Sequence, residues 1–281
     1  MSNKDEIIVE IKKPINNKKK KKKKVKKISN IKQVKKKQSK GRKLFIKISL
    51  ILSLLILAFI ILASTEIFNI KEISVSGTDK LTANEIISFS QIQYEENLFK
   101  INFSNVKNKI KENSYVEEVS LKRILPNKIQ INITERKPKY MLQLAESYIY
   151  IDGQGYILEI SKEKKEIPIL LGVLTDLSNI KESDRLEKED LLKLNTVNAI
   201  VATAENYEIL KLITRIDITN ISEYILYLDT EIKSAYIGDA SDLNTRILWV
   251  KTITEQNLNI PGKIFVNMDL NSRKPYFRQE S

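Results

Sequence analysis

The longest apolar run of the chain lies near its beginning and separates a lysine-rich segment from about 215 residues of mixed composition. Its uninterrupted core covers residues 48–63, and flanking residues extend the run over 44–65. A helix rises 1.5 Å per residue, so about 21 residues are enough to cross a hydrocarbon layer of about 30 Å. The pattern therefore predicts one membrane-spanning helix over residues 44–65.

The next seventy or so residues switch between the period of a strand and the period of a helix. Apolar and polar positions alternate over residues 68–75 and again in two runs separated by a turn at 125–128, which predicts three strands. Between them, Thr82 and Glu85 have the spacing of a capping box, and Ser104 is placed to cap a second short helix. The predicted order is strand, helix, helix, strand, strand.

From residue 138 onwards the pattern predicts a second region made mostly of strands. Two short apolar runs flank a glycine-containing turn at residues 152–155, as in a hairpin. Asp242 is placed to cap a helix whose apolar residues recur on one face. The expected strands cover residues 148–151, 156–158, 213–218, 224–228, 234–237 and 264–270, and the other expected helix covers residues 186–206.

Charge is distributed unevenly along the chain. Residues 1–47 contain 20 Lys or Arg and three acidic residues, a net charge of +17, whereas the whole chain carries +13. The remainder therefore carries −4, which gives no support to a nucleic-acid-binding surface in that part. Positive charge beside a spanning helix stays on the cytoplasmic side. We expect a single-pass type II protein of the plasma membrane, with its carboxyl-terminal part outside the cell.

Two other interpretations of the amino-terminal segments are open. A cleaved signal peptide has a short basic region before an apolar run of 7–15 residues, whereas nearly 50 residues precede the run here. The lysine run could bind RNA or serve as an address signal. Its simpler interpretation is a segment held near anionic lipid at about 1 kcal/mol per residue. The residues assigned to this membrane-surface role are Lys18, Lys19, Lys20, Lys21, Lys22, Lys23 and Lys24.

The chain contains neither Cys nor His in 281 residues. Thiol nucleophiles, structural zinc, haem ligation and imidazole-based acid–base catalysis are thereby excluded. The seven glycines form no phosphate-binding loop, and no spacing of acidic residues selects a carboxylate pair of the glycosidase type. We expect no cofactor, no metal and no enzymatic activity.

One set of residues matches a known domain pattern in register over about 70 residues. They are Phe68-x-Ile70-x-x-Ile73-x-Val75-x-Gly77, Asn97-Leu98-Phe99, Val116-x-x-Val119, Arg123-x-x-Pro126 and Ile129-x-Ile131-x-Ile133-x-Glu135-Arg136-x-Pro138. This pattern resembles the POTRA domain of the bacterial cell-division proteins FtsQ and DivIB. The resemblance continues past Pro138 through the segment Tyr148–Leu158, which is similar to the opening hairpin of that family's β domain.

The resemblance implies an α+β fold with a single amino-terminal transmembrane helix, a POTRA domain of β-α-α-β-β order, and a mixed β domain with two helices. The implied boundaries are 1–43 for a disordered basic cytoplasmic tail, 44–65 for the transmembrane helix, 66–137 for the POTRA domain, 138–271 for the β domain, and 272–281 for a carboxyl-terminal edge strand or tail.

The resemblance also implies a non-enzymatic scaffold of the divisome, the cell-division assembly, concentrated at the septum. The implied partners are DivIC/FtsB-like and FtsL-like coiled-coil membrane proteins, the septal peptidoglycan synthases indirectly, and the lipid bilayer. Two other functions stay open. One is a polypeptide-transport component, although residues 139–281 are too few for a large outer-membrane barrel. The other is a membrane-anchored cell-wall hydrolase.

In this family a partner's segment is received as an added strand, and the last residues of the chain fit such an edge. Pro275 lacks an N–H and suits an edge strand, and Tyr276 with Phe277 would place one aromatic ring on each face. The simpler alternative for this edge is fraying of the last five residues. Trp249, the only Trp, fits either an interface or the border of the core. The candidate partner-binding residues are Phe265, Met268, Leu270, Pro275, Tyr276, Phe277 and Trp249.

Overall fold

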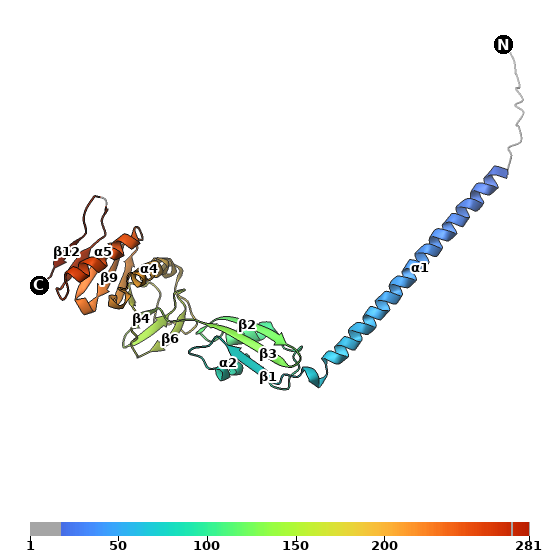
Figure 1. The fold of residues 1–281 in the computed structure, drawn as a ribbon, viewed down its shortest axis with the longest axis horizontal. Helices are drawn as coiled ribbons and strands as arrows, with labels where there is room; N and C mark the ends of the chain where they lie inside the picture. Colours follow the sequence, from blue (N-terminus) through green and yellow to red (C-terminus); the bar gives the residue numbers. More distant parts are fainter. Residues whose placement is uncertain (1–17, 271, 281) are drawn as a thin grey trace, which may run out of the picture. The chain divides into compact units, whose positions relative to one another are not determined.

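A computed structural model describes residues 18–270 and 272–280, and the chain divides into two compact units, Met1–Thr65 and Glu66–Ser281. The described part of the first unit is one helix, α1 (Lys18–Ala63), drawn in blue in Figure 1. Its segment Gly41–Ala63 is long and apolar enough to cross a membrane, and no part of its apolar window is buried. The structure thus has a candidate span where the sequence predicts one.

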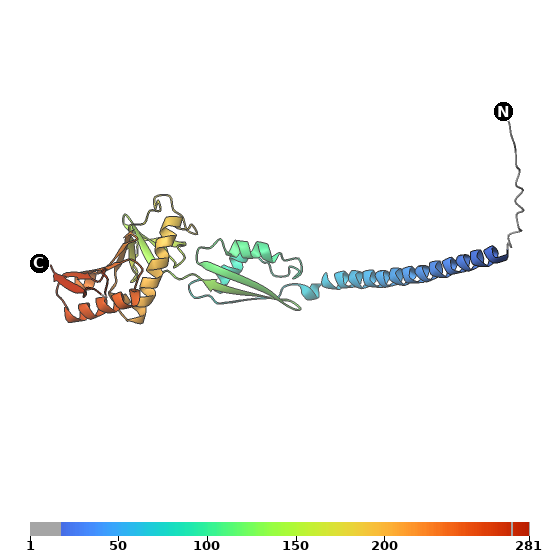
Figure 2. The same ribbon diagram turned by 90° about the horizontal axis from the view of Figure 1, so that it is seen from above.

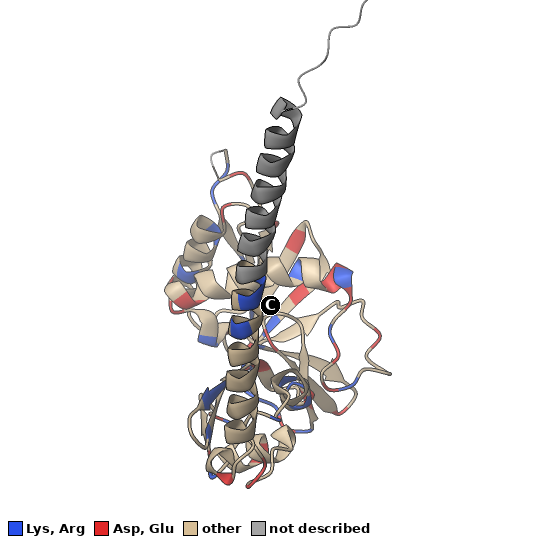
Figure 3. Cartoon of the chain, turned by 90° about the vertical axis from the view of Figure 1, so that its right-hand side faces the viewer, with Lys and Arg blue, Asp and Glu red and all other residues tan. Residues whose placement is uncertain are grey.

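The basic segment differs from the sequence expectation. A disordered tail was expected up to residue 43, whereas α1 begins at Lys18 and continues without interruption into the apolar segment. Lys and Gln are good helix formers, and no Gly or Pro stands between Lys18 and Lys40. Figure 3 shows basic residues where the described side chains of α1 begin and none further along the span. Residues 1–17 of the expected tail lie outside the described residues.

The second unit begins with a three-stranded sheet, here called the amino-terminal sheet. Its strand order is β1-β3-β2, with β1 parallel and β2 antiparallel to β3. Two helices cover one face of this sheet (Figure 2) and bury Ile86, Val106 and Ile110 against it. The order β-α-α-β-β expected for residues 66–137 is therefore present. Its elements are η1 (Glu66–Phe68), β1 (Glu72–Ser76), α2 (Ala83–Ser90), α3 (Phe103–Ile110), β2 (Val116–Ile124) and β3 (Lys128–Glu135).

The cap of α2 is the one that the sequence predicts, whereas the cap of α3 is a different residue. The capping box is formed, since Thr82 accepts from the Glu85 N–H and Glu85 reaches back to the Thr82 N–H. The cap of α3 is Asn102 and not Ser104, because the Asn102 side chain accepts hydrogen bonds from two N–H groups of the first turn. The residue type at the cap was right in kind, and the position was wrong by two.

Arg123 and Glu135, which both belong to the POTRA-like sequence pattern, do not pair with each other across the β2–β3 hairpin. Strand register places Arg123 opposite Ile129. The Arg123 guanidinium donates to the carbonyl oxygens of Leu98 and Ile101, at 3.0 and 2.7 Å. Glu135 instead accepts from backbone N–H groups of residues 80 and 81. Each charge therefore fixes a loop to the sheet.

The rest of the unit is built on a nine-stranded sheet, here called the carboxyl-terminal sheet. Its strand order is β12-β11-β10-β9-β8-β7-β4-β5-β6. The pairs β4–β7, β7–β8 and β10–β11 are parallel, and the others are antiparallel. Its elements are β4 (Tyr140–Leu144), β5 (Ser147–Ile151), β6 (Ile157–Ser161), β7 (Ile169–Leu171), α4 (Lys188–Asn206), η2 (Leu210–Leu212), β8 (Arg215–Asn220), β9 (Glu223–Leu228), η3 (Asp229–Glu231), β10 (Lys233–Gly238), α5 (Leu243–Gln256), β11 (Gly262–Phe265) and β12 (Tyr276–Gln279).

The two faces of the carboxyl-terminal sheet are covered differently. One face packs against α4 and α5 along the sheet, and this core buries residues such as Leu142, Ile216 and Ile264. On the other face, β4 to β7 bury residues such as Met141 and Tyr150 in the same cluster as the core of the amino-terminal sheet. Both cores consist of residues from 70 onwards. The segment 66–281 is therefore expected to fold without α1.

Two expectations for the last part of the chain need correction. The alternation of apolar residues predicted a strand over 264–270, but β11 ends at Phe265, because β12 pairs with it only over four residues. Asp242 does precede α5, yet its side chain makes no capping hydrogen bond, and its backbone is left-handed with φ 50°.

Candidate functional site

The strand β12 forms one edge of the carboxyl-terminal sheet. It pairs with β11 in the register Phe265 opposite Tyr276 and Lys263 opposite Arg278, and no other described strand pairs with it. The N–H of Glu280 donates to the carbonyl oxygen of Pro261 at 3.0 Å. Because hydrogen-bonded and non-bonded pairs alternate in an antiparallel ladder, Phe277 and Gln279 direct their N–H and C=O groups away from β11. These groups offer the backbone pattern that an added strand needs.

Three aromatic rings form a ladder that leads to this edge. Tyr236, Phe265 and Tyr276 lie on neighbouring strands, with ring centroids 5.0 and 4.8 Å apart and interplanar angles of 13° and 19°. Arg278 lies over the Phe265 ring at 5.2 Å. These three rings are called the aromatic ladder (Tyr236, Phe265 and Tyr276). Its last ring, Tyr276, is 45% exposed and lies on the edge strand.

Phe277 faces the opposite side and anchors β12 to the core beneath α4 and α5. A Cβ atom at Gly262 would lie 2.6 Å from the Phe277 ring and 2.3 Å from the carbonyl oxygen of Arg278. Glycine at this position therefore allows β12 to approach β11 closely. The predicted placement of one aromatic ring on each face is what the structure has.

A salt bridge fixes the end of this edge. The Lys263 ammonium lies 2.6 Å from the Glu280 carboxylate, and this hydrogen bond raises the pKa of Lys263 above its ordinary value. Arg278, on the neighbouring position of β12, has no carboxylate within salt-bridge distance among the described residues. Among the residues that the structure describes, Arg278 thus has no salt-bridge partner at this edge.

The other predicted site residues are scattered. Pro275 directly precedes β12, as an edge strand permits, and Phe265 lies in the aromatic ladder. Met268 and Leu270 are half-buried in the connection between β11 and β12 and belong to no strand. Trp249 is 38% exposed on α5. The backbone of Lys18 to Lys24 begins α1, and the side chains of these lysines lie outside the described part.

Comparisons with known proteins bear on residues from both sheets. Residues 68–136 match the family model described as "POTRA domain, FtsQ-type". The protein named cell division protein DivIB of Clostridium tetani is 31% identical over 205 residues, covering 69% of this chain and 73% of that protein. This chain belongs to the DivIB/FtsQ family of cell-division proteins.

Other members of the DivIB/FtsQ family agree with this assignment. DivIB of Clostridium acetobutylicum is 28% identical over 214 residues and covers 76% of this chain and 84% of its own length. A solved structure, the major extracytoplasmic domain of the trans isomer of DivIB from Geobacillus stearothermophilus, covers 44% of this chain and 98% of its own at 12% identity, with a TM-score of 0.27. A TM-score this low adds nothing to the assignment, which rests on the sequence matches.

The opposite edge of the sheet, β6, is closed at its beginning in this DivIB/FtsQ-family chain. The Ile157 N–H donates to Asp184 O, the Ser183 N–H donates to Ile157 O, and the Ser114 hydroxyl of the POTRA domain donates to Leu158 O at 2.6 Å. Because backbone groups of Ile157 and Leu158 are already paired, the beginning of β6 offers little for an added strand.

A cluster of POTRA side chains, not foreseen from the sequence, also closes β6. The Glu159 carboxylate accepts hydrogen bonds from Lys80 and from the Tyr115 hydroxyl, the latter at 2.6 Å, and Lys80 lies 3.6 Å from the centre of the Tyr115 ring. These bonds lower the pKa of Glu159, with Lys80 as the largest cause. No sequence signal links these residues, because the partners are 44 and 79 positions apart.

Proposed function

We propose that this cell-division protein acts as a non-enzymatic scaffold of the divisome, and that it receives a partner's segment as an added strand at β12. The family relationship supports partners of the DivIC/FtsB-like and FtsL-like coiled-coil type, through which the chain would reach the septal peptidoglycan synthases. The observation that carries this proposal is the contrast between β12, whose outer side has no described neighbouring strand, and β6, whose first two residues already have outer partners.

The aromatic ladder supports recognition of a particular kind of strand. Residues directly opposite each other in a sheet lie on the same face. A residue opposite Tyr276 would extend the stack of Tyr236, Phe265 and Tyr276, which favours a planar side chain. A residue opposite Arg278 would meet a cation without a carboxylate partner, which favours an acidic side chain. The backbone then supplies affinity and these two positions supply specificity.

The proposed topology follows from the charge of the first unit. Basic residues flank the beginning of the candidate span, and the positive side of such a helix stays in the cytoplasm. The carboxyl-terminal unit would then lie outside the membrane and gather at the septum with its partners. We retain the role of Lys18 to Lys24 at the anionic lipid surface as part of the proposal.

A proline substitution tests the edge directly. Gln279→Pro removes an outward N–H while leaving the inward bonds to β11 in place, so partner capture should be lost and thermal unfolding should change little. The tagged full chain and the DivIC-like protein of the same organism are co-expressed and then solubilised in detergent. The measurement is how much of the DivIC-like protein co-purifies with the tagged chain. Arg278→Pro is the control that breaks an inward bond and should lower the melting temperature. Full capture by a stably folded Gln279→Pro variant would refute strand addition at β12.

A further inference from the structure

Exposed apolar side chains gather at one end of the POTRA domain. Ile67, Phe99 and Leu125 are 58%, 40% and 60% exposed. They come from η1, from the loop before α3, and from the turn between β2 and β3. In Figures 1 and 2 this turn lies at the same end of the domain as η1. These three side chains are called the apolar tip (Ile67, Phe99 and Leu125).

Contacts hold the three segments of the apolar tip together. The Phe68 ring lies 5.2 Å from the Phe99 ring, which joins η1 to the loop before α3. The Lys71 N–H donates to Asn127 O at 2.9 Å, which joins the segment after η1 to the turn. The Arg123 guanidinium, near the end of β2, bonds to two carbonyl groups of the same loop. The tip is therefore a fixed surface whose side chains point outward from tied segments.

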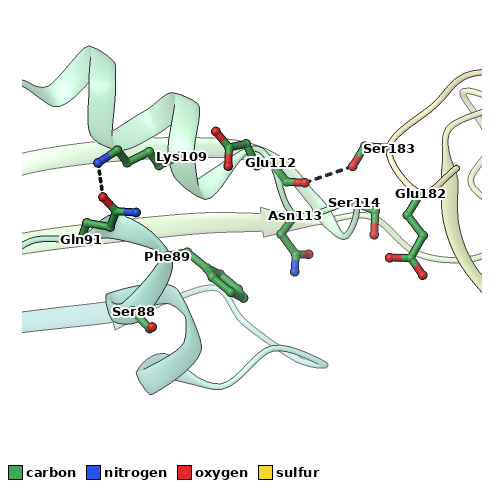
Figure 4. A pocket seen from close by; sticks show the side chains of 9 residues that line it. All are labelled: Ser88, Phe89, Gln91, Lys109, Glu112, Asn113, Ser114, Glu182 and Ser183. Atoms are coloured by element: carbon green, nitrogen blue, oxygen red, sulfur yellow. Dashed lines mark hydrogen bonds between the residues drawn. The ribbon is translucent and has the colours of Figure 1, made fainter.

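The other end of β2 has a different character. The hollow in Figure 4 lies beside Ser114, just before β2 begins. Of the nine described residues that line this hollow, Phe89 alone is apolar. Within the POTRA domain the exposed large hydrophobic residues are the three of the tip and Tyr94. Exposed apolar surface is thus concentrated at the end of the domain that follows the candidate span in the chain.

We infer that the apolar tip docks on the surface of the lipid bilayer in which the candidate span lies. The candidate span ends at Ala63, and the four residues from there to Ile67 reach at most about 14 Å. The polar layer on each side of the hydrocarbon is itself about 5–8 Å thick. The bilayer is therefore the one surface that the chain itself keeps within reach of the tip. Burying the three side chains at its boundary removes apolar area from water.

The charges around the tip are balanced, so the apolar side chains and not anionic lipid should hold it. Within four residues of the tip residues, the exposed cations are Lys71, Lys100 and Lys122, and the exposed acids are Glu66, Glu95 and Glu96. Docking should therefore be similar on neutral and on anionic bilayers. The inference rests on the candidate span and does not depend on strand addition at β12.

The test places a fluorophore on the apolar tip of the full chain in lipid nanodiscs. Leu125→Cys provides the attachment, since the chain has no Cys. Lipids that carry a nitroxide close to the headgroup quench a fluorophore that docks. Ile221→Cys is the matched control, because Ile221 is 64% exposed in the turn between β8 and β9. Quenching should be several-fold stronger at residue 125 than at residue 221.

A longer connection separates docking from simple tethering. An insertion of about eight Gly and Ser residues after Thr65 adds about 15 Å of flexible reach. The fluorophore at residue 125 should stay quenched in this lengthened chain, because the tip holds itself at the surface. Ile67→Asn in the lengthened chain should reduce the quenching several-fold, whereas Ile221→Asn should not. Both side chains are exposed, so thermal unfolding should change little.

Three outcomes would overturn the inference. One is that the insertion alone lowers the quenching at residue 125 to the level seen at residue 221, since the span would then act only as a tether. Another is that Ile67→Asn leaves the quenching of the lengthened chain unchanged. The third is that docking occurs on nanodiscs with phosphatidylglycerol and not on phosphatidylcholine alone, since charge would then hold the domain at the bilayer.

Discussion

The two edges of the carboxyl-terminal sheet are treated in opposite ways. Ile157 at the beginning of β6 is paired with the connection before α4, the POTRA domain contacts the next residue, and the pairing of β6 with β5 has a register shift at Tyr150 and Ile151. β12 has β11 on one side and no described strand on the other. Exposed edges invite unwanted pairing, and bulges and covering segments are the usual protection. This difference between the two edges is the basis of the proposal that a partner's strand is added at β12.

The largest loss of stability should come from shortening a buried side chain of β6. Leu158 on β6 is fully buried against the POTRA core, so Leu158→Ala should lower the free energy of unfolding by about 2–5 kcal/mol through lost burial and a cavity. Urea unfolding of residues 66–281 measures it. Tyr276→Ala on the open edge is the comparison, with an expected loss of about 0.5–1.5 kcal/mol from one aromatic contact. Similar losses at both positions would remove the distinction between the edges.

Gly262→Ala should lower stability less than Leu158→Ala does. It should, however, loosen the contact between β12 and β11. The added Cβ would meet the Arg278 carbonyl and the Phe277 ring, so β12 must move away from β11. We expect a loss of about 1–3 kcal/mol from overpacking. Hydrogen exchange should show faster exchange of the amides of residues 278 and 280, which bond inward, and partner capture should fall.

Gly153→Ala is the matched control for that variant. Gly153 lies in the turn between β5 and β6, and its added Cβ would contact side-chain atoms at 3.1 Å, which can shift. Exchange in β12 should be unchanged by this substitution. If Gly262→Ala leaves the exchange of β12 as slow as in the parent, then close contact with β11 does not hold the edge strand.

Sequence predicted the parts of this fold that depend on neighbours along the chain. The capping box of Thr82 and Glu85 is local, and it formed as predicted. The strand over 264–270 was wrong because its length is set by β12, whose partner residues begin after a ten-residue connection. Likewise, Tyr150 is buried because the POTRA core covers it. The alternation of residues along a strand does not show which other part of the chain covers each face.

At β12, too, the features set by neighbouring residues were predicted and the features set by strand register were not. Pro275 and the aromatic pair marked β12 as an edge strand, since proline cannot join a ladder on its N–H side. Tyr236 and Arg278 were missed, although both belong to the surface around the edge. Their roles arise from the register of three strands, of which one pair is parallel and one antiparallel. Register between strands far apart in sequence is set by tertiary packing.

The smallest predicted effect concerns charge at the closed edge. Lys80 and Tyr115 lower the pKa of Glu159 in the folded state, so this carboxylate stabilises the fold above its ordinary pKa of about 4.3. The contribution is lost as the pH falls through the lowered pKa of the folded state. Since the side chain is 31% exposed, solvent screening keeps the contribution under about 1 kcal/mol. Glu159→Gln should therefore lower stability slightly at pH 7 and not at all at low pH.

Unfolding at several pH values compares the contribution of a carboxylate at β6 with that of a carboxylate at β12. Urea unfolding of the parent and of Glu159→Gln, at steps from pH 7 to pH 3, should give curves that converge as Glu159 takes up a proton. Glu280→Gln, at the salt bridge beside β12, removes a carboxylate that is 48% exposed and joins residues of the same open edge. It should lower stability at pH 7 by less than Glu159→Gln does, because the more exposed pair is screened more by solvent. A larger effect at Glu280 would mean that charge fixes β12 more firmly than it fixes β6, and the open edge would then be the more rigid of the two.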